Sequence, residues 1–440
     1  MNTVHERIKT VLLVVLLCGA VFMAYSTWFY DNPLGDASDV LFASEGAVPG
    51  NGEYSFSANA ASNLSPVRIG VKNSIMRIGA EYSKAAIDSA YANTRGLMAE
   101  ALSAQTGSWS RADEEAWQNM LTWQGVLYDY QGIVRADIMA DWLWGGQSEV
   151  GNIQGRFLLF AINPKDNRTI LAIKNPDTGD IYTGYTQINK ETVLSVLDQI
   201  QGTPCLLACE SGESEYKNLA PESFISAAAM PGVINGYNDC AGFTKDQKNT
   251  IIKSFGFTPY SISEHVEKDG TQVYIAGSST IRIEPDGFIV YRNTDTSADA
   301  TQGIFVRSAS ETASETEIFE TACTLVSRLA QITGGDGKLY PKSFSYIRGE
   351  NRCVADFGWS VNGVPIDRQK TGYAARVVIS DMKVIAVEFY MHRYQNTDRP
   401  SNLLNKKLAA AAVENKSGKL EIRYTDGGQT DLEPGWYLKN

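Results

Sequence analysis

The sequence has little histidine and no cluster of basic residues. Three histidines occur among the 440 residues, at positions 5, 265 and 392, so histidine-based chemistry has few places to occur. Lys and Arg number 39 against 50 Asp and Glu, which gives a formal net charge of -11. A surface that binds the phosphates of a nucleic acid needs clustered Lys and Arg. The composition therefore argues against a nucleic-acid partner.

The signatures of several enzyme and cofactor sites are also missing. No His-Glu-x-x-His occurs, and His265 and His392 are too far apart to suggest a zinc site. We expect His392 to be a half-exposed strand residue. No Gly-x-Ser-x-Gly elbow and no Walker A loop occur, and the glycine-rich run at 334–338 is typical of a helix end. We therefore expect no metal, no cofactor and no catalytic residue.

Cysteine is too scarce for a disulfide framework. One of the six cysteines, Cys18, falls in an apolar run near the N-terminus. The remaining five, an odd number that cannot all pair, are Cys205, Cys209, Cys240, Cys323 and Cys353. A bridge from Cys205 to Cys209 or to Cys240 is conceivable, but we expect scattered buried thiols.

The clearest signal is an apolar run at residues 11–30, which are twenty residues without a charge. An α-helix of that length crosses a hydrocarbon core of roughly 30 Å. Trp, Phe and Tyr close the run at 28–30, as in an aromatic belt. Arg7 and Lys9 precede it, and the next basic residue is Arg68. The positive-inside rule then places the tail, residues 1–10, in the cytoplasm and the bulk of the chain outside the cell membrane.

A cleaved signal peptide or a lipoprotein site would be the alternatives to a membrane anchor. Ala43-Ser44-Glu45 does not make a convincing cleavage site, and Leu17 stands where a lipoprotein signal before Cys18 has a small residue. We therefore predict an uncleaved transmembrane helix.

The rest of the chain is predicted to be α+β, with modules of helix and antiparallel sheet outside the membrane. Residues 31–60 contain Gly, Pro, Ser or Asn at 13 of 30 positions and are predicted to be a linker. The predicted limits are 61–240 for an N-terminal domain, 241–308 for a middle module and 309–440 for a C-terminal module.

The N-terminal domain mixes helices and hairpins. The apolar face formed by Ile87, Tyr91, Met98 and Leu102 predicts a helix. Asn-Pro dipeptides between apolar runs from 156 to 185 are typical of antiparallel hairpins. The other predicted elements are a strand at 66–71, helices at 112–121 and 192–200, and a strand followed by a helix over 126–144.

The two later modules share a pattern of one helix followed by hairpins. Thr244 with Gln247 and Ser314 with Glu317 predict capping boxes at the two helix starts. The other predicted features are a hairpin turn at 286–287, strands over 343–366 and 374–391, a helix at 402–412, and a last hairpin that turns at 426–428.

Two Ser-x-x-Lys strings are candidate nucleophile sites. Penicillin-binding chemistry needs the serine at the start of a buried helix with the lysine one turn later. Ser214, with Lys217, lies in a polar run, and Ser380, with Lys383, lies in a turn, so chance explains both. The acidic run at 113–115 is expected to be a solvated helix face.

The ordered layout of the chain resembles the YycH and YycI family of single-pass membrane proteins of Gram-positive bacteria, and the length is closer to YycH. The matching segments are ERIKTVLLVVLL followed by TWFY, the stretch 244–293 with IRIEPDGFIVYRN, and the C-terminal end with Leu432, Pro434, Trp436 and Tyr437. The resemblance implies a protein without enzymatic activity that regulates the YycG (WalK) sensor histidine kinase of a two-component system.

Members of this family contact the kinase partly through the transmembrane helix, and a YycI-like protein would be a second partner. Small residues permit close helix approach, because packing drives helix association in lipid. The predicted contact face consists of Leu12, Leu16, Gly19, Ala20, Met23 and Thr27. A lipid-facing span with incidental small residues would look the same.

Two rival hypotheses stay open besides the kinase regulator. One is an envelope enzyme, a peptidoglycan-directed hydrolase or transferase that uses Ser214 or a carboxylate pair. The other is a binding module that inhibits a secreted hydrolase.

Overall fold

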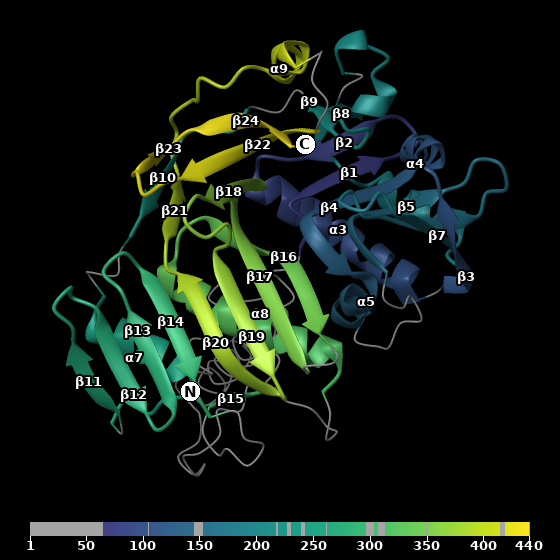
Figure 1. Ribbon diagram of the computed structural model, residues 1–440. Helices are drawn as coiled ribbons and strands as arrows, with labels where there is room; N and C mark the ends of the chain where they lie inside the picture. The colour runs from purple at the N-terminus through teal and green to yellow at the C-terminus, as the bar shows by residue number, and fades with distance from the viewer. Residues whose placement is uncertain are drawn as a thin grey trace, which may run out of the picture. The chain divides into compact units, whose positions relative to one another are not determined.

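The fold of the described residues is α+β, as the sequence predicts (Figure 1). The computed structural model describes residues 65–439 except 104, 145–152, 217–218, 227–229, 239–242, 261, 296–302, 307–312, 348–350 and 414–418. The predicted span at 11–30, with its contact face, lies outside these residues. No helix in the described part of the chain is long and apolar enough to cross a membrane.

The N-terminal half forms a nine-stranded antiparallel sheet in the order β3-β7-β6-β5-β4-β1-β2-β8-β9. Its strands are β1 (Arg68–Lys72), β2 (Arg77–Ala80), β3 (Gln105–Ala112), β4 (Gly125–Arg135), β5 (Gln154–Ile162), β6 (Thr169–Lys174), β7 (Ile181–Thr186), β8 (Thr203–Leu207) and β9 (Phe224–Ser226). The predicted Asn-Pro turns join β5 to β6 and β6 to β7. In each turn an Asn side chain, Asn163 or Asn175, accepts a hydrogen bond from the backbone two residues later.

Helices cover the two faces of this N-terminal sheet unequally. Strand side chains alternate between faces, so Leu158 and Phe160 of β5 point to one apolar layer, and Phe157 and Leu159 to the other. The first layer is shared with α3 (Lys84–Ser103), α5 (Ala136–Trp144) and α6 (Lys190–Leu197). Among the described helices, α4 (Glu114–Leu121) alone contributes to the second layer.

The C-terminal half forms a twelve-stranded sheet in the order β11-β12-β13-β14-β20-β19-β17-β18-β22-β24, with β15 on β20 and β16 on β17 (Figure 1). Its strands are β11 (Ser263–Val266), β12 (Gln272–Ala276), β13 (Ser279–Ile283), β14 (Phe288–Asn293), β15 (Ile304–Phe305), β16 (Gly337–Ile347), β17 (Arg352–Val361), β18 (Val364–Arg368), β19 (Ala375–Ser380), β20 (Lys383–Tyr390), β22 (Lys419–Asp426) and β24 (Pro434–Lys439). All its pairs are antiparallel except β18 with β22. Because β14 pairs with β20, the predicted middle and C-terminal modules share this sheet. Their limits stay a prediction.

Both predicted capping boxes are confirmed. Thr244 and Gln247 cap α7 (Lys245–Ser254), and Ser314 and Glu317 cap α8 (Glu315–Thr333). The buried stripe of α8 packs on the C-terminal sheet. The hairpin turn at Asp286-Gly287 is also confirmed, and Gly287 has a φ of 86°, which favours glycine.

Two predicted elements near the C-terminus begin or end elsewhere. The last helix, α9 (Lys406–Ala412), is shorter than predicted because the side chain of Asn405 caps it by accepting a hydrogen bond from the Leu408 backbone N–H. The turn at 426–428 is present. The chain then forms β23 (Asp431–Leu432), which pairs with β10 (Ile234–Tyr237) in a small sheet completed by β21 (Arg393–Asn396).

Strand β4 of the N-terminal sheet packs directly on β16 of the C-terminal sheet, and a glycine permits this contact. A Cβ atom on Gly132 would lie 1.8 Å from the carbonyl oxygen of Pro341 and 2.9 Å from the Cα of Lys342. The clash is with backbone, so a side chain at this position forces the two strands apart.

Replacing this glycine should destabilise the protein. We expect Gly132→Ala to lower the free energy of unfolding by about 2–3 kcal/mol, because overpacking strains the backbone contact. Gly96→Ala is the matched control. Position 96 is exposed in α3 with open space around it, so alanine there should add about 0.5–1 kcal/mol. Urea unfolding measures the free energy of unfolding of both variants. A Gly132→Ala variant that is as stable as the Gly96→Ala variant would contradict the packing argument.

Candidate functional site

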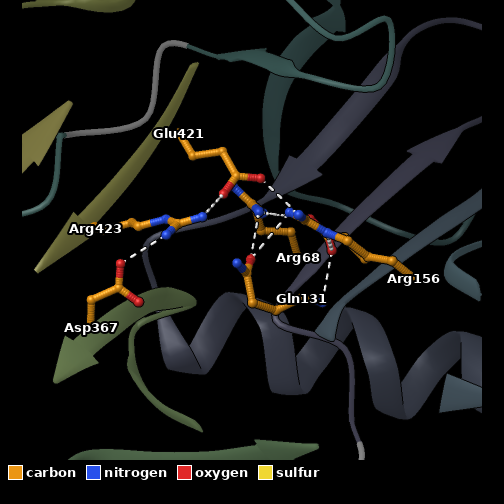
Figure 2. Close-up of polar contacts among 7 residues, drawn as sticks. Arg68, Gln131, Arg156, Asp367, Glu421 and Arg423 are labelled. Carbon is orange, nitrogen blue, oxygen red and sulfur yellow. Dashed lines mark hydrogen bonds and ion pairs between the residues drawn. The ribbon is translucent and has the colours of Figure 1, made fainter. Parts of the chain in front are cut away.

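A connected cluster of polar side chains lies where the N-terminal sheet meets strand β22 (Figure 2). We call it the charge clamp. Its members are Arg68 of β1, Asp129 and Gln131 of β4, Arg156 of β5, Asp367 of β18, and Glu421 and Arg423 of β22.

Strand register and a bulge position the N-terminal members of the clamp. Arg68 stands directly opposite Asp129 across the β1–β4 ladder. The register of β4 against β5 shifts between Asp129 and Val134, and Gln131 adopts a φ of 67°. Such a bulge re-aims side chains. Here the Oε1 of Gln131 accepts hydrogen bonds from Arg68 Nη2 at 3.0 Å and from Arg156 Nη2 at 3.2 Å.

Asp129 is the buried acceptor on the N-terminal side, with 2% of its surface exposed. Its Oδ2 accepts from Arg68 Nε at 3.0 Å, and its Oδ1 accepts from Arg156 Nε at 2.8 Å. The backbone N–H of Gln131 donates to the same Oδ1 at 2.8 Å. Burial alone would raise the pKa of Asp129, but Arg156 and Arg68 outweigh it, so the pKa lies below its ordinary value.

Arg156 connects the two halves of the described chain. Its Nη1 donates to Oε1 of Glu421 at 2.7 Å, across 265 positions of sequence. The other oxygen of Glu421 accepts from Arg423 at 2.9 Å, and Arg423 also donates to Asp367 at 2.8 Å. Burial would raise the pKa of Glu421, yet Arg156 and Arg68 lower it far below its ordinary value.

A small pocket of about 60 Å³ adjoins the clamp. Lys406, the first residue of α9, enters it and donates to Glu81 and to the carbonyl oxygen of Phe224, both at 2.7 Å. Burial lowers the pKa of Lys406, and Glu81 only partly opposes that shift. This contact ties α9 to the N-terminal sheet beside the clamp.

The electrostatics of the clamp suit a structural role. A general acid at neutral pH needs a raised carboxyl pKa, whereas those of Asp129 and Glu421 are lowered. An arginine does not lose its proton in proteins. In the part of the chain that the structure describes, no group of three or more His, Cys, Asp or Glu side chains could hold a metal ion. The chemistry of the cluster is therefore to hold β22 on the N-terminal sheet.

The structure places both candidate serines away from a buried helix start. Ser214 is exposed at the start of the 3-10 turn η2 (Ser214–Tyr216), and its hydroxyl donates to Glu215. Its predicted partner, Lys217, lies outside the described residues. Ser380 ends β19 and donates to Asp381, while Lys383 donates to the carbonyl of Asp295. The two strings therefore lack the geometry that penicillin-binding chemistry requires.

The acidic run at 113–115 serves α4. Asp113 is its N-cap and accepts from the Ala116 backbone N–H at 2.8 Å. Glu114 accepts from the buried ammonium of Lys174 at 2.8 Å, and Glu115 is exposed.

The prediction for His392 is wrong. The residue lies between β20 and β21 and is buried rather than half-exposed. Its Nδ1 is 3.3 Å from Oδ2 of Asp426, which also contacts Arg368 at 3.0 Å and the hydroxyl of Tyr394 at 2.6 Å. Burial of this histidine follows from the aspartate, which gives the imidazole a polar partner in the core.

The four described cysteines carry free thiols: Cys205, Cys209, Cys323 and Cys353. The conceivable bridge between Cys205 and Cys209 is therefore absent, and three of the four thiols are buried, as expected. Burial raises the pKa of the Cys205 thiol to about 12, which makes it unreactive. Cys240 lies outside the described residues.

Sequence reasoning missed every member of the charge clamp. The available signal was the position of single charges within apolar strands, as in VLYDYQ around Asp129 and GRFLLF around Arg156. A charge at such a position is buried and needs a partner. The identity of the partner, Glu421, depends on a contact that one sequence does not specify.

No protein-family model matches the sequence, and no curated protein matches it. Among solved structures, the chain is similar to the crystal structure of YycH from Bacillus subtilis, with a TM-score of 0.48 and 8% identity over 89% of this chain and 96% of that one. It is also similar to the crystal structure of an uncharacterized protein from Eubacterium rectale, with a TM-score of 0.31 and 15% identity over 48% of this chain and 77% of that one. At these TM-scores the two likenesses assign neither a family nor a function to the chain.

Breaking the clamp at Arg156 should destabilise the fold strongly. We expect Arg156→Met to lower the free energy of unfolding by about 3–5 kcal/mol, because it leaves Asp129 and Glu421 buried without their shared cation. The control is Arg111→Met at an exposed ion pair with Asp180, where the loss should be far smaller. Chemical denaturation measures both, and similar losses would show that the clamp contributes no more than a surface pair.

The lowered carboxyl pKa values predict a direction for the effect of acid. A group whose folded pKa is below its unfolded value stabilises the protein above the unfolded pKa, about 4, and loses that contribution as the pH falls. Stability should therefore stay steady between about pH 6 and 8 and decline below about pH 4–5. Glu421→Gln should show a shallower decline in urea unfolding across this range. A stability that rises on acidification would contradict the assignment.

Proposed function

We propose that this chain is a membrane-anchored, non-enzymatic regulator of a sensor histidine kinase of the YycG (WalK) type, which controls cell-wall homeostasis. In this proposal residues 1–10 lie in the cytoplasm, residues 11–30 form a single transmembrane helix, and the α+β part lies outside the membrane. A YycI-like protein is a second partner.

The observation that carries the proposal is the ordered layout of the sequence, from the apolar N-terminal run to the C-terminal Leu432, Pro434, Trp436 and Tyr437. The structure supports one part of this layout. The stretch 244–293 contains the capped helix α7 and the β13–β14 hairpin, with its turn at Gly287. Over this stretch, the resemblance depends on this helix and this hairpin.

The charge clamp gives such a regulator a mechanical basis. Arg68 stands at the start of β1, only a few residues after the first described residue, and Glu421 stands in β22 near the C-terminus. Because Arg68, Asp129, Arg156 and Glu421 form one connected network, both ends of the described chain belong to one stiff unit. A load or a ligand on either sheet would therefore act on the strand that follows the predicted linker and anchor.

Exchange of the transmembrane helix tests the proposal directly. We expect the full-length chain, solubilised from its native membrane, to recover a sensor histidine kinase by affinity capture and mass spectrometry. A chain whose residues 11–30 are replaced by an unrelated span should recover about tenfold less, because tight packing of small residues is lost. Failure of both chains to recover a kinase, under conditions that preserve known membrane complexes, would refute the proposal.

A matched pair of variants locates the contact within the helix. Gly19→Leu with Ala20→Leu fills the predicted contact face, and Val14→Phe with Val21→Phe adds similar bulk to the opposite face. Kinase recovery should fall only for the first pair. Equal recovery from both pairs would remove this face from the contact while leaving the exchange experiment to decide on the regulator itself.

Serine substitutions separate the regulator from the envelope enzyme. Ser214→Ala and Ser380→Ala should leave kinase recovery unchanged and alter the free energy of unfolding by no more than about 0.5 kcal/mol, because both hydroxyls are at the surface. A folded variant that loses its effect on cell-wall metabolism while still recovering the kinase would favour the enzyme. An unrelated anchor that preserves full function would favour the third hypothesis, a module that inhibits a secreted hydrolase.

A further inference from the structure

A groove of about 580 Å³ lies on the face of the N-terminal sheet that α4 covers. Three helices pack on the other face, whereas α4 has eight residues and covers only part of its own. The groove lies beside α4, over the end of the sheet formed by β6, β7 and β3. Pockets of this size accommodate small organic ligands.

The floor of the groove, which we call the α4 groove, is apolar and aromatic. Met120 of α4 and Ile170 of β6 are buried beneath it. Trp123 and Tyr185 are half-buried, so part of each ring reaches the groove. The guanidinium of Arg168 stacks 3.6 Å from the ring centroid of Tyr185, which fixes that ring in place.

Polar groups surround this floor. Asn119, Lys165 and the hydroxyl pair of Ser110 and Thr183, 3.0 Å apart, line the groove. Within the described residues, the side-chain amide of Asn119 and the ammonium of Lys165 have no hydrogen-bond partner in the protein. They are therefore available to a ligand.

An apolar and aromatic floor with a rim of amide and hydroxyl groups matches the surface of a sugar ring, which has an apolar C–H face and a hydroxyl edge. Orientation in such pockets comes from a few placed polar groups around aromatic contacts. Among the described residues, the lining contains one charged side chain, Lys165, and no carboxylate. A ligand with one negative group facing Lys165 fits this charge better than a neutral or cationic one.

We propose that the α4 groove binds a short glycan that carries a carboxylate, with sugar rings against Trp123 and Tyr185, the amide of Asn119 on the sugar hydroxyls and the carboxylate beside Lys165. An extended proline-rich peptide also docks on aromatic grooves. The ammonium of Lys165 favours the glycan, because the carbonyl oxygens of a proline-rich peptide carry no negative charge to pair with it.

This inference goes beyond the proposed kinase regulation and does not depend on it. The kinase contact is assigned to the transmembrane helix, whereas the groove belongs to the N-terminal sheet. The chain could bind a glycan without recovering a kinase, or recover a kinase without binding a glycan. The two experiments therefore test the two proposals separately.

Isothermal titration of the full-length chain in detergent micelles tests the groove. The probes are the disaccharide of N-acetylglucosamine and N-acetylmuramic acid, which carries one free lactyl carboxylate, a neutral N-acetylglucosamine trimer, and a decaproline peptide. We expect the muramyl probe to bind most tightly. Lys165→Ala should weaken the muramyl probe about tenfold and leave the neutral trimer unchanged, and Asn119→Ala should weaken both saccharides about tenfold.

Both variants are at exposed positions, so a folding defect is not expected. Lys268→Ala, at an exposed lysine in the β11–β12 turn, is the matched control and should bind as the unmodified chain does. The proposal is overturned if neither saccharide binds, or if binding is unaffected by Asn119→Ala and Lys165→Ala. If decaproline binds and Asn119→Ala abolishes that binding, the groove is assigned to a protein segment instead. If the chain prefers the neutral trimer, the role of Lys165 is overturned.

Discussion

The arrangement of the two large sheets depends on one side chain, that of Arg156. Its guanidinium binds Asp129 within the N-terminal sheet and Glu421 on β22, so a single planar group with five donors serves acceptors from both halves of the chain. Lysine could not do this, because its ammonium lacks the fixed fork that reaches two carboxylates at once. Arg68 and Arg423 extend the network on either side, which leaves Asp129 and Glu421 with two cations each.

A buried ion network is a costly way to join two sheets. Removing charges from water is unfavourable, and apolar replacements of similar volume often make proteins more stable. The ion network contributes hydrogen bonds of fixed geometry between the sheets, which apolar contacts do not provide. The backbone ladder sets the register of β22 against β18, and the Arg156–Glu421 contact adds a directional link from β22 to the N-terminal sheet. The close backbone approach at Gly132 acts in the same sense, since it leaves no room for an alternative packing of β4 on β16.

The features that local sequence specifies were predicted well. Capping boxes at Thr244 and Ser314 and the turn at Gly287 depend on residues within a few positions of one another, so one sequence contains all the information they need. The clamp does not have this property. Arg156 and Glu421 are 265 positions apart, and nothing near either residue names the other. His392 failed for the same reason, because its burial depends on Asp426, which comes from a later strand.

The clamp and the α4 groove require opposite properties of their polar side chains, and they lie at separate positions on the same sheet. The clamp needs its buried charges paired, and the paired arginines lower the pKa values of Asp129 and Glu421 although burial alone would raise them. A binding groove needs polar groups that remain available to a ligand, as are those of Asn119 and Lys165 with respect to the described residues. Strand order separates the two: β1, β4 and β5 carry the clamp at the centre of the sheet, and β6, β7 and β3 carry the groove toward one edge.

Because β5 pairs with β6, a ligand that orders the groove edge would stiffen the strand that carries Arg156. The shared ladder is thus the shortest physical connection between a bound ligand and the contact that holds the two sheets together.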